Sequence, residues 1–214
     1  MLDHFPSELE AAYSFGINYD ASWDLQIADK GIPVHLYDHT IPAPPQMHHN
    51  FHFQPRGICG HRRAPGLMTL ADCLRQNGHS NAVALLLKMD VEGWEWDVFS
   101  ECPSTLLDKF QQIVVEYHGL THSAYQPRRF GETIQILEKL NQTHQVVHVH
   151  ANSLSSVLAV KRLVLPDLLE VTYIRRSDFS HKIVDDERIF PTDLDEPTLD
   201  SSPALYLGRF DGNF

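Results

Sequence analysis

The sequence predicts an α/β protein with a doubly wound, mostly parallel, seven-stranded sheet. Short apolar runs that fit strands alternate with segments of helical spacing along most of the 214 residues. Residues 82–87 are apolar without alternation, as expected for a strand that is buried on both faces of a parallel sheet. Glycines, prolines and capping residues separate these runs. Strands that alternate with helices in this way form parallel sheets with right-handed crossovers.

The first half of the chain contains one βαβ unit and two further strands. The predicted strands are residues 11–17, 34–37, 50–54 and 82–89. Ser22 is the predicted N-cap of a helix at residues 22–30, and Gly31 ends this helix. Thr69 begins a second helix, which stops near Gly78.

The second half adds three strands and an acidic tail. The predicted strands are residues 112–117, 145–150 and 168–174, and the predicted helices are residues 94–100, 103–110 and 131–141. From Ser177 onward, nine acids against three Lys or Arg residues give a net charge of −6, and prolines disfavour regular structure. Residues 204–207 are compatible with a docked edge strand. We therefore expect a domain at residues 1–176 and an acidic extension at residues 177–214.

Composition limits the partners of the protein. The formal net charge of −11 argues against a nucleic-acid footprint or an anionic membrane surface. No apolar run approaches the roughly 18 residues that span a bilayer, and the N-terminus lacks a signal pattern. The three cysteines are unclustered, which fits a reducing cytosol. We expect a cytoplasmic protein with a small or neutral partner, and the sequence gives no oligomeric state.

Polar residues at three predicted strand ends indicate a cofactor site. Gly16 follows the first strand, where a glycine lets a ligand approach the backbone, and Asp38 ends the second strand about twenty residues later. A carboxylate at that place can accept both hydroxyl protons of a ribose. The GxGxxG cradle of a dinucleotide is absent, so a cofactor with ribose but without phosphate fits better. Asp90 ends the fourth strand, although Asp90, Glu92 and Glu95 also fit an acid cluster at a helix start.

Several short motifs occur along the chain in a fixed order, and the most specific is Lys88-Met89-Asp90-Val91-Glu92-Gly93-Trp94-Glu95. The others are Tyr13–Ile17, Val34–Asp38, Thr69–Asp72, Val115–His118, His148–Asn152 and Leu169–Tyr173. In order and spacing, this series resembles the FkbM family of S-adenosylmethionine-dependent methyltransferases. The resemblance covers residues 11–176. It implies a seven-stranded class I methyltransferase fold that binds S-adenosylmethionine and methylates a hydroxyl, often on a sugar. The expected cofactor contacts are Ser14, Phe15, Gly16, Asp20, Asp38 and Asp90. Family members often carry an N-terminal segment over the cofactor, so we expect a more open enzyme or a fragment.

Methyl transfer to oxygen needs a base or a metal opposite the methyl group. His118 is the first candidate base, because its unperturbed pKa suits neutral pH and Glu116 points to the same side of the strand. Asp90, Glu116 and His118 form an alternative ligand set for Mg or Mn. His118 also fits a simple strand cap. His148 and His150 share one face of a strand and either extend the pocket or face solvent.

Three functions are compatible with these features. The first is methylation of a hydroxyl on a sugar, glycan or other small-molecule acceptor. The second is a nicotinamide-dependent oxidoreductase, because Asp38 suits that cofactor's ribose equally well. The third is a non-catalytic module whose acidic tail recruits a basic partner.

Overall fold

The structure is a computed structural model that describes residues 8–61, 65–153, 155–160, 163–179, 189–193, 195–196 and 205–209. The chain divides into two compact units at residues 1–115 and 116–214. Strand β7 (Phe110–Tyr117) contains this division. In the part of the chain that is described, no helix is both long and apolar enough to cross a bilayer.

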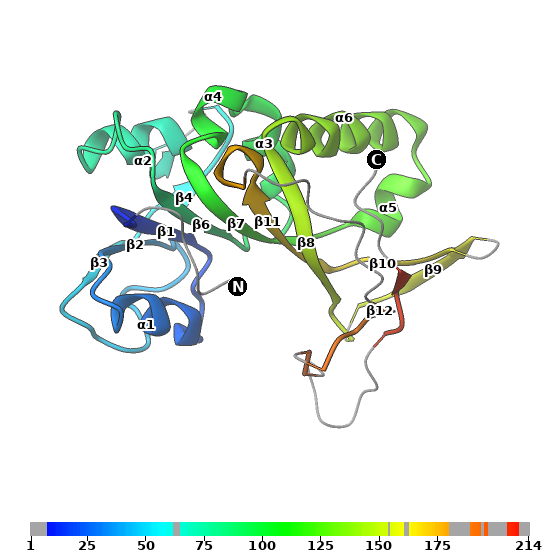
Figure 1. Ribbon diagram of the computed structural model, residues 1–214, viewed down its shortest axis with the longest axis horizontal. Helices are drawn as coiled ribbons and strands as arrows, with labels where there is room; N and C mark the ends of the chain where they lie inside the picture. The colour runs from blue at the N-terminus through cyan, green and yellow to red at the C-terminus, as the bar shows by residue number, and fades with distance from the viewer. Residues whose placement is uncertain are drawn as a thin grey trace. The chain divides into compact units, whose positions relative to one another are not determined.

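The first unit holds most of the parallel strands. Its other elements are β1 (Ala11–Phe15), α1 (Ser22–Ala28), β2 (Val34–Tyr37), β3 (Phe51–Gln54), β4 (Gly57–Ile58), β5 (Leu67–Met68), α2 (Leu70–Gln76), β6 (Leu85–Met89), α3 (Glu95–Glu101) and α4 (Ser104–Leu107). Strands β3-β2-β1-β6-β7 are neighbours in that order, and each pair is parallel. Figure 1 shows α1 on one side of β1 and β2 and α2 on the other.

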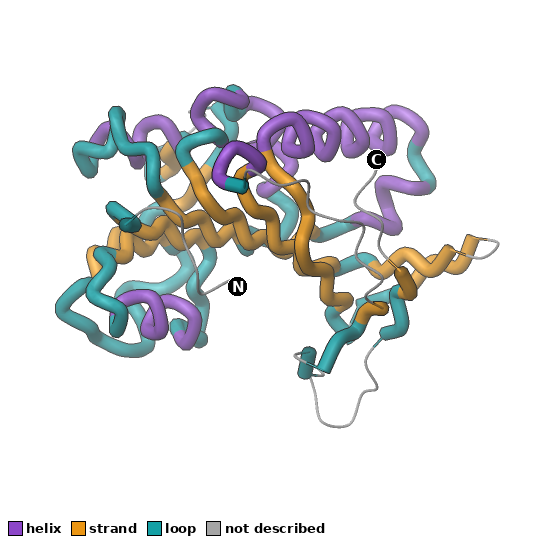
Figure 2. Tube along the Cα trace, in the orientation of Figure 1, coloured by secondary structure: helices purple, strands orange, loops and turns teal. Residues whose placement is uncertain are grey.

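The second unit is built around an antiparallel pair of strands. Its elements are α5 (Leu120–Ala124), α6 (Pro127–Thr143), β8 (His144–Ala151), β9 (Val157–Val160), β10 (Leu163–Pro166), β11 (Leu169–Arg175), the 3-10 turn η1 (Arg176–Asp178), β12 (Ile189–Phe190) and β13 (Gly208–Arg209). Strands β8 and β11 are antiparallel. Helix α6, the long helix in Figure 2, is followed directly by β8.

The seven-stranded sheet has the order β3-β2-β1-β6-β7-β11-β8 and confirms the predicted fold class. All seven predicted strands belong to it. Counted along the chain, they read 3-2-1-4-5-7-6. The order reverses between β1 and β6, which makes their carboxyl ends the topological switch point where open α/β sheets bind ligands. The short pairs β4–β5, β9–β10 and β12–β13 were not predicted.

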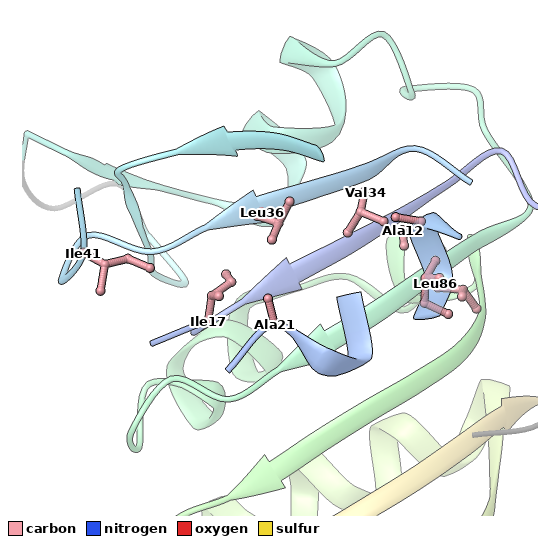
Figure 3. Packing of buried hydrophobic residues seen from close by; sticks show 9 residues of the cluster. Ala12, Ile17, Ala21, Val34, Leu36, Ile41 and Leu86 are labelled. Atoms are coloured by element: carbon pink, nitrogen blue, oxygen red, sulfur yellow. The ribbon is translucent and has the colours of Figure 1, made fainter. Parts of the chain in front are cut away.

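A cluster of apolar side chains fixes α1 on β1, β2 and β6 (Figure 3). Ala12 and Leu86 come from neighbouring strands, and Ile27 and Ala28 from the helix, and all four are essentially inaccessible to solvent. Burying an Ile or Leu side chain contributes about 1.5–3 kcal/mol. The βαβ unit predicted from the sequence is therefore held by its own core.

Two local predictions are wrong, and the edge strand predicted at residues 204–207 is not seen in residues 205–207. Ser22 does not cap α1, because the cap position is Ala21 and the backbone N–H of Ser22 instead donates to Asp20 Oδ1 at 2.8 Å. The helix expected at residues 103–110 is only the single turn α4, since Phe110 already begins β7. In the tail, Ala204 lies outside the described residues and residues 205–207 form no strand. The strand that follows, β13, pairs with β12 and not with the edge of the large sheet.

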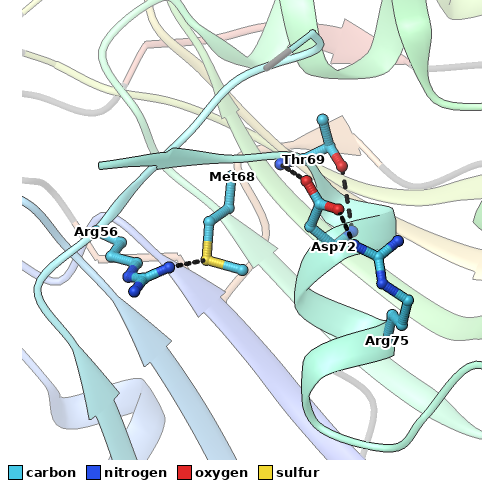
Figure 4. Close-up of polar contacts among 5 residues, drawn as sticks. All are labelled: Arg56, Met68, Thr69, Asp72 and Arg75. Atoms are coloured by element: carbon cyan, nitrogen blue, oxygen red, sulfur yellow. Dashed lines mark hydrogen bonds and ion pairs between the residues drawn. The ribbon is translucent and has the colours of Figure 1, made fainter. Parts of the chain in front are cut away.

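The cap predicted at Thr69 is confirmed and forms a reciprocal capping box with Asp72. The backbone N–H of Asp72 donates to Thr69 Oγ1 at 3.1 Å, and the backbone N–H of Thr69 donates to Asp72 Oδ2 at 3.4 Å. Arg75 pairs with the same carboxylate, and nearby Arg56 contacts the sulfur of Met68 at 3.5 Å (Figure 4). Two otherwise unsatisfied N–H groups at the start of α2 are paired in this way.

Thr69→Ala should lower the free energy of unfolding by about 1 kcal/mol, because it removes the side-chain acceptor of this cap. Ser22→Ala is the matched control and should change it by less than about 0.5 kcal/mol, since Ser22 makes no cap. Urea unfolding at neutral pH measures both. Equal losses in the two variants would show that the Thr69 cap does not stabilise the fold.

The face of β1 and β2 opposite α1 carries stacked aromatic and imidazole rings. His35 stacks on Tyr13 with a centroid distance of 5.0 Å, and its ring is also 5.0 Å from His52 and 5.3 Å from His79. Burial, then the neighbouring imidazoles of His52 and His79, lower the pKa of His35 to about 4. His35 is therefore neutral in the folded protein at neutral pH.

This shift predicts a loss of stability in acid. The unfolded chain protonates His35 below its ordinary pKa of about 6.5, whereas the folded chain does not until about pH 4. The contribution of neutral His35 to the free energy of unfolding is complete above pH 6.5. It is lost as the pH falls toward 4, at up to about 1.4 kcal/mol per pH unit. His35→Phe keeps a stacking ring without a titrating group. Urea unfolding measures the free energy of unfolding at pH 7 and pH 5. Between these pH values it should fall more in the wild type than in His35→Phe. Identical decreases would contradict a lowered pKa of His35.

Candidate functional site

The turn after β1 lies at the switch point and is built around Gly16. Its N–H donates to the carbonyl of Tyr37 at 3.1 Å, and the N–H of Asp90 donates to the carbonyl of Phe15 at 3.0 Å. Gly16 has a φ of +78°, and a Cβ at this position would lie 1.5 Å from the carbonyl oxygen of Asp90. The fold therefore requires glycine here because the end of β6 approaches its backbone. A ligand contact at Gly16 stays a prediction.

Asp38 holds the same turn from the end of β2. Its Oδ2 accepts the backbone N–H groups of Ile17 at 2.9 Å and Asn18 at 2.8 Å. Its Oδ1 accepts the N–H of Thr40 at 2.7 Å and the hydroxyl of Thr40 at 2.6 Å. These four bonds match the number of lone-pair sites on a carboxylate. Burial tends to raise the pKa of Asp38, but the bonds from Thr40, Asn18 and Ile17 outweigh it and lower the pKa, so Asp38 stays ionised.

Lys88 holds the turn from the side of β6. Its ammonium donates to the carbonyl oxygen of Gly16 at 3.0 Å. That carbonyl and the N–H of Ile17 belong to one planar peptide unit. The single peptide between Gly16 and Ile17 is thus bonded to Lys88 at its oxygen and to Asp38 at its nitrogen. No role was predicted for Lys88 from the sequence, although it begins the Lys88–Glu95 motif, two residues before Asp90.

The acids after β6 divide into two groups. Glu95 is fully buried in the first turn of α3, and its Oε2 accepts the N–H of Gly93 at 2.9 Å. It is the helix-start acid of the alternative interpretation. Asp90 directly follows β6 and is only partly buried. Ser14 and Phe15 are buried in β1, and Asp20, which lies between β1 and α1, is exposed. Asp20, Asp38 and Asp90 thus follow three neighbouring strands of the first unit.

In the second unit, Glu116 and His118 lie together as predicted. His118 Nε2 is 3.6 Å from Glu116 Oε2, and both side chains are mostly buried. Asn152, which follows β8, donates to Glu116 Oε1 at 3.0 Å. Asn152 received no role from the sequence, because 36 residues separate it from Glu116. The carboxylate is thereby held between an imidazole and an amide.

His148 and His150 both face carboxylates, so neither simply faces solvent. His148 Nε2 is 3.0 Å from Asp195 Oδ1, and Asp195 Oδ2 accepts the N–H of Thr192 at 2.6 Å. His150 Nδ1 is 3.5 Å from Glu170 Oε2. The hydrogen bond to Glu170 raises the pKa of His150 against the effect of burial. Asp195 belongs to the acidic tail, and no local sequence signal placed it beside β8.

The three candidate metal ligands come from both units. Asp90 follows β6 in the first unit, whereas Glu116 and His118 belong to the second. Met89 in β6 and Val115 in β7 are register partners. Asp90 directly follows Met89 in the sequence, and Glu116 directly follows Val115. Two carboxylates and one imidazole are ligand types that suit Mg or Mn.

The sheet order and the acids at its switch point define a class I methyltransferase fold. Residues 24–143 match the family described as the methyltransferase FkbM domain. These 120 residues are more than half of the 214-residue chain, so the protein belongs to the FkbM methyltransferase family. The matched residues include Asp38, Asp90, Glu116 and His118. No curated protein matches the chain.

Gly16→Ala should destabilise the protein by more than about 3 kcal/mol, because the added Cβ forces the Asp90 carbonyl away in addition to the cost of a positive φ. Gly31→Ala is the matched control. Its φ is +83°, but no atom lies within 4 Å of the added Cβ, so it should cost only about 1–2 kcal/mol. Chemical unfolding measures both. A Gly16→Ala variant as stable as Gly31→Ala would contradict the close approach of Asp90.

Proposed function

We propose that the protein is an S-adenosylmethionine-dependent methyltransferase that methylates a hydroxyl on a sugar or another small acceptor in the cytoplasm. The observation that carries this proposal is the Gly16 turn with Asp20, Asp38 and Asp90 at the switch point of a methyltransferase-family fold. Family membership supports the reaction class. The choice of cofactor and acceptor rests on the chemistry of the residues.

The acids of the first unit suit S-adenosylmethionine. This cofactor carries a positive sulfonium and ammonium and two ribose hydroxyl donors, and carboxylates complement both kinds of group. The low pKa of Asp38 keeps one such acceptor charged. Asp38 would accept the ribose hydroxyls on Oδ1 in place of the two bonds from Thr40, while Oδ2 orders the amides of Ile17 and Asn18. Asp20 and Asp90 would face the cationic end. When bound, the cofactor supplies an electrophilic methyl group.

The Glu116–His118 pair supports a metal-free route. A general base needs a second group that orients it, and Glu116 lies beside His118 while Asn152 fixes Glu116. His118 would accept the proton of the acceptor hydroxyl as that oxygen attacks the methyl group. In the alternative with a metal, Asp90, Glu116 and His118 would hold Mg or Mn, which lowers the pKa of the hydroxyl.

Titration calorimetry with S-adenosylmethionine tests the cofactor. Asp38→Asn should weaken binding by about 1.5–3 kcal/mol, the scale of lost charge-assisted hydrogen bonds, while circular dichroism shows a folded protein. Asp29→Asn, which changes an exposed carboxylate at the end of α1, should bind like the wild type. Absence of binding at millimolar cofactor by folded wild-type protein would refute the proposal. NADH fluorescence in the same samples tests the nicotinamide alternative.

His118→Ala tests the base. Turnover, measured as radiolabelled methyl transfer to a panel of glycans and small alcohols, should fall by about 10²–10⁴ and be insensitive to EDTA. If His118 is a ligand, EDTA should abolish the wild-type activity and Mg or Mn should restore it. His122→Ala, which removes an exposed histidine of α5, is the control. Both roles would be excluded if EDTA left wild-type turnover unchanged and if the His118→Ala variant also kept wild-type turnover.

A further inference from the structure

Asp24 is an unusual residue in the core of the first unit. It lies in α1 with no solvent exposure, and neither of its carboxylate oxygens has a hydrogen-bond partner. The hydroxyl of Ser14 in β1 is also buried without a partner. A buried carboxylate is costly unless a charge or donor compensates it. The surroundings of Asp24 must therefore supply that compensation.

The compensating charge comes from Lys88. Ser14 and Lys88 are register partners in the parallel strands β1 and β6, so their side chains emerge on the same face of the sheet. Ala12 and Leu86, two residues earlier on each strand, pack against α1 on that face. Asp24 projects from this same helix. Burial raises the pKa of Asp24, and the charge of Lys88 acts against that rise.

Lys88 connects this buried acid to the candidate cofactor turn. An ammonium has three donors, and one of them is bonded to the carbonyl of Gly16 at 3.0 Å. The position of that carbonyl also fixes the N–H of Ile17, because the two groups share one peptide plane. The bond from Lys88 therefore acts on the same peptide whose N–H donates to Asp38.

We propose that Asp24 and Lys88 are a buried charge pair that positions the Gly16 turn for the cofactor. Lys88 holds the turn carbonyl, and Asp24 supplies the negative charge that keeps the ammonium at this partly buried place. Neither residue touches the cofactor, so both are positioning residues. The inference rests on the proposed function for its binding part only, since the order of the turn exists without any ligand.

The first test uses the protein without cofactor. In Lys88→Met, hydrogen exchange of the amides of Ile17 and Asn18 should be at least about tenfold faster, the scale of one lost charge-assisted bond. Lys109→Met is the matched control: Lys109 donates to the carbonyl of Ala82 at 3.0 Å, far from the turn in sequence. It should leave these amides unchanged. Unchanged exchange in Lys88→Met would overturn the proposal. If Lys88→Met does not fold, the uncharged Lys88→Gln replaces it with the same expectations.

The second test is a double-mutant cycle on stability. Lys88→Met and Asp24→Asn should each lower the unfolding midpoint, and the double variant should be more stable than the sum of the two losses predicts, because it leaves no unpaired charge. Strictly additive losses would overturn the pairing.

The third test is titration calorimetry with S-adenosylmethionine. Affinity should fall at least about tenfold in Lys88→Met and in the double variant, since both lack the donor to Gly16, and should not change in Lys109→Met. Wild-type affinity in Lys88→Met would overturn the positioning role. If the wild type itself does not bind the cofactor, the proposed function fails. The exchange and stability results still show whether Asp24 and Lys88 form a charge pair that orders the Gly16 turn.

Discussion

The peptide between Gly16 and Ile17 is the unit on which the candidate site depends. Its oxygen is bonded to Lys88, and its nitrogen is bonded to Asp38. The carbonyl of Asp90 occupies the place where a side chain at residue 16 would be. Three strands, β1, β2 and β6, thus fix one turn at the point where the sheet order reverses. A rigid turn with ordered amides and nearby carboxylates reduces the entropy that a bound cofactor would lose.

The two units contribute different chemistry. The first holds acids that suit a cationic nucleoside ligand, with Asp38 kept ionised by hydrogen bonds. The second holds imidazole–carboxylate pairs, of which Glu116–His118 lies at the end of β7 and His148–Asp195 joins β8 to the tail. The division between the two units lies within strand β7.

The sheet was predictable because its strands are local signals. Apolar runs bounded by glycine, proline and polar residues mark all seven strands, and the Thr69 cap needs only residues three positions apart. Long-range facts were not predictable. Gly16 is required by Asp90, 74 residues later, and Asp24 looks like an ordinary surface acid until its burial is known. Asp195 reads as part of a solvated tail, yet its carboxylate pairs with His148.

The most direct test of this account is a titration of ¹⁵N-labelled protein with S-adenosylhomocysteine, the unreactive product form of the proposed cofactor, followed by amide chemical shifts. We predict that the largest changes occur at the amides of Gly16 to Asp20 and of Asp38 to Thr40. Saturable binding that leaves these amides unchanged and shifts a separate group, such as the amides of α6, would contradict the assignment of the Gly16 turn as the cofactor site.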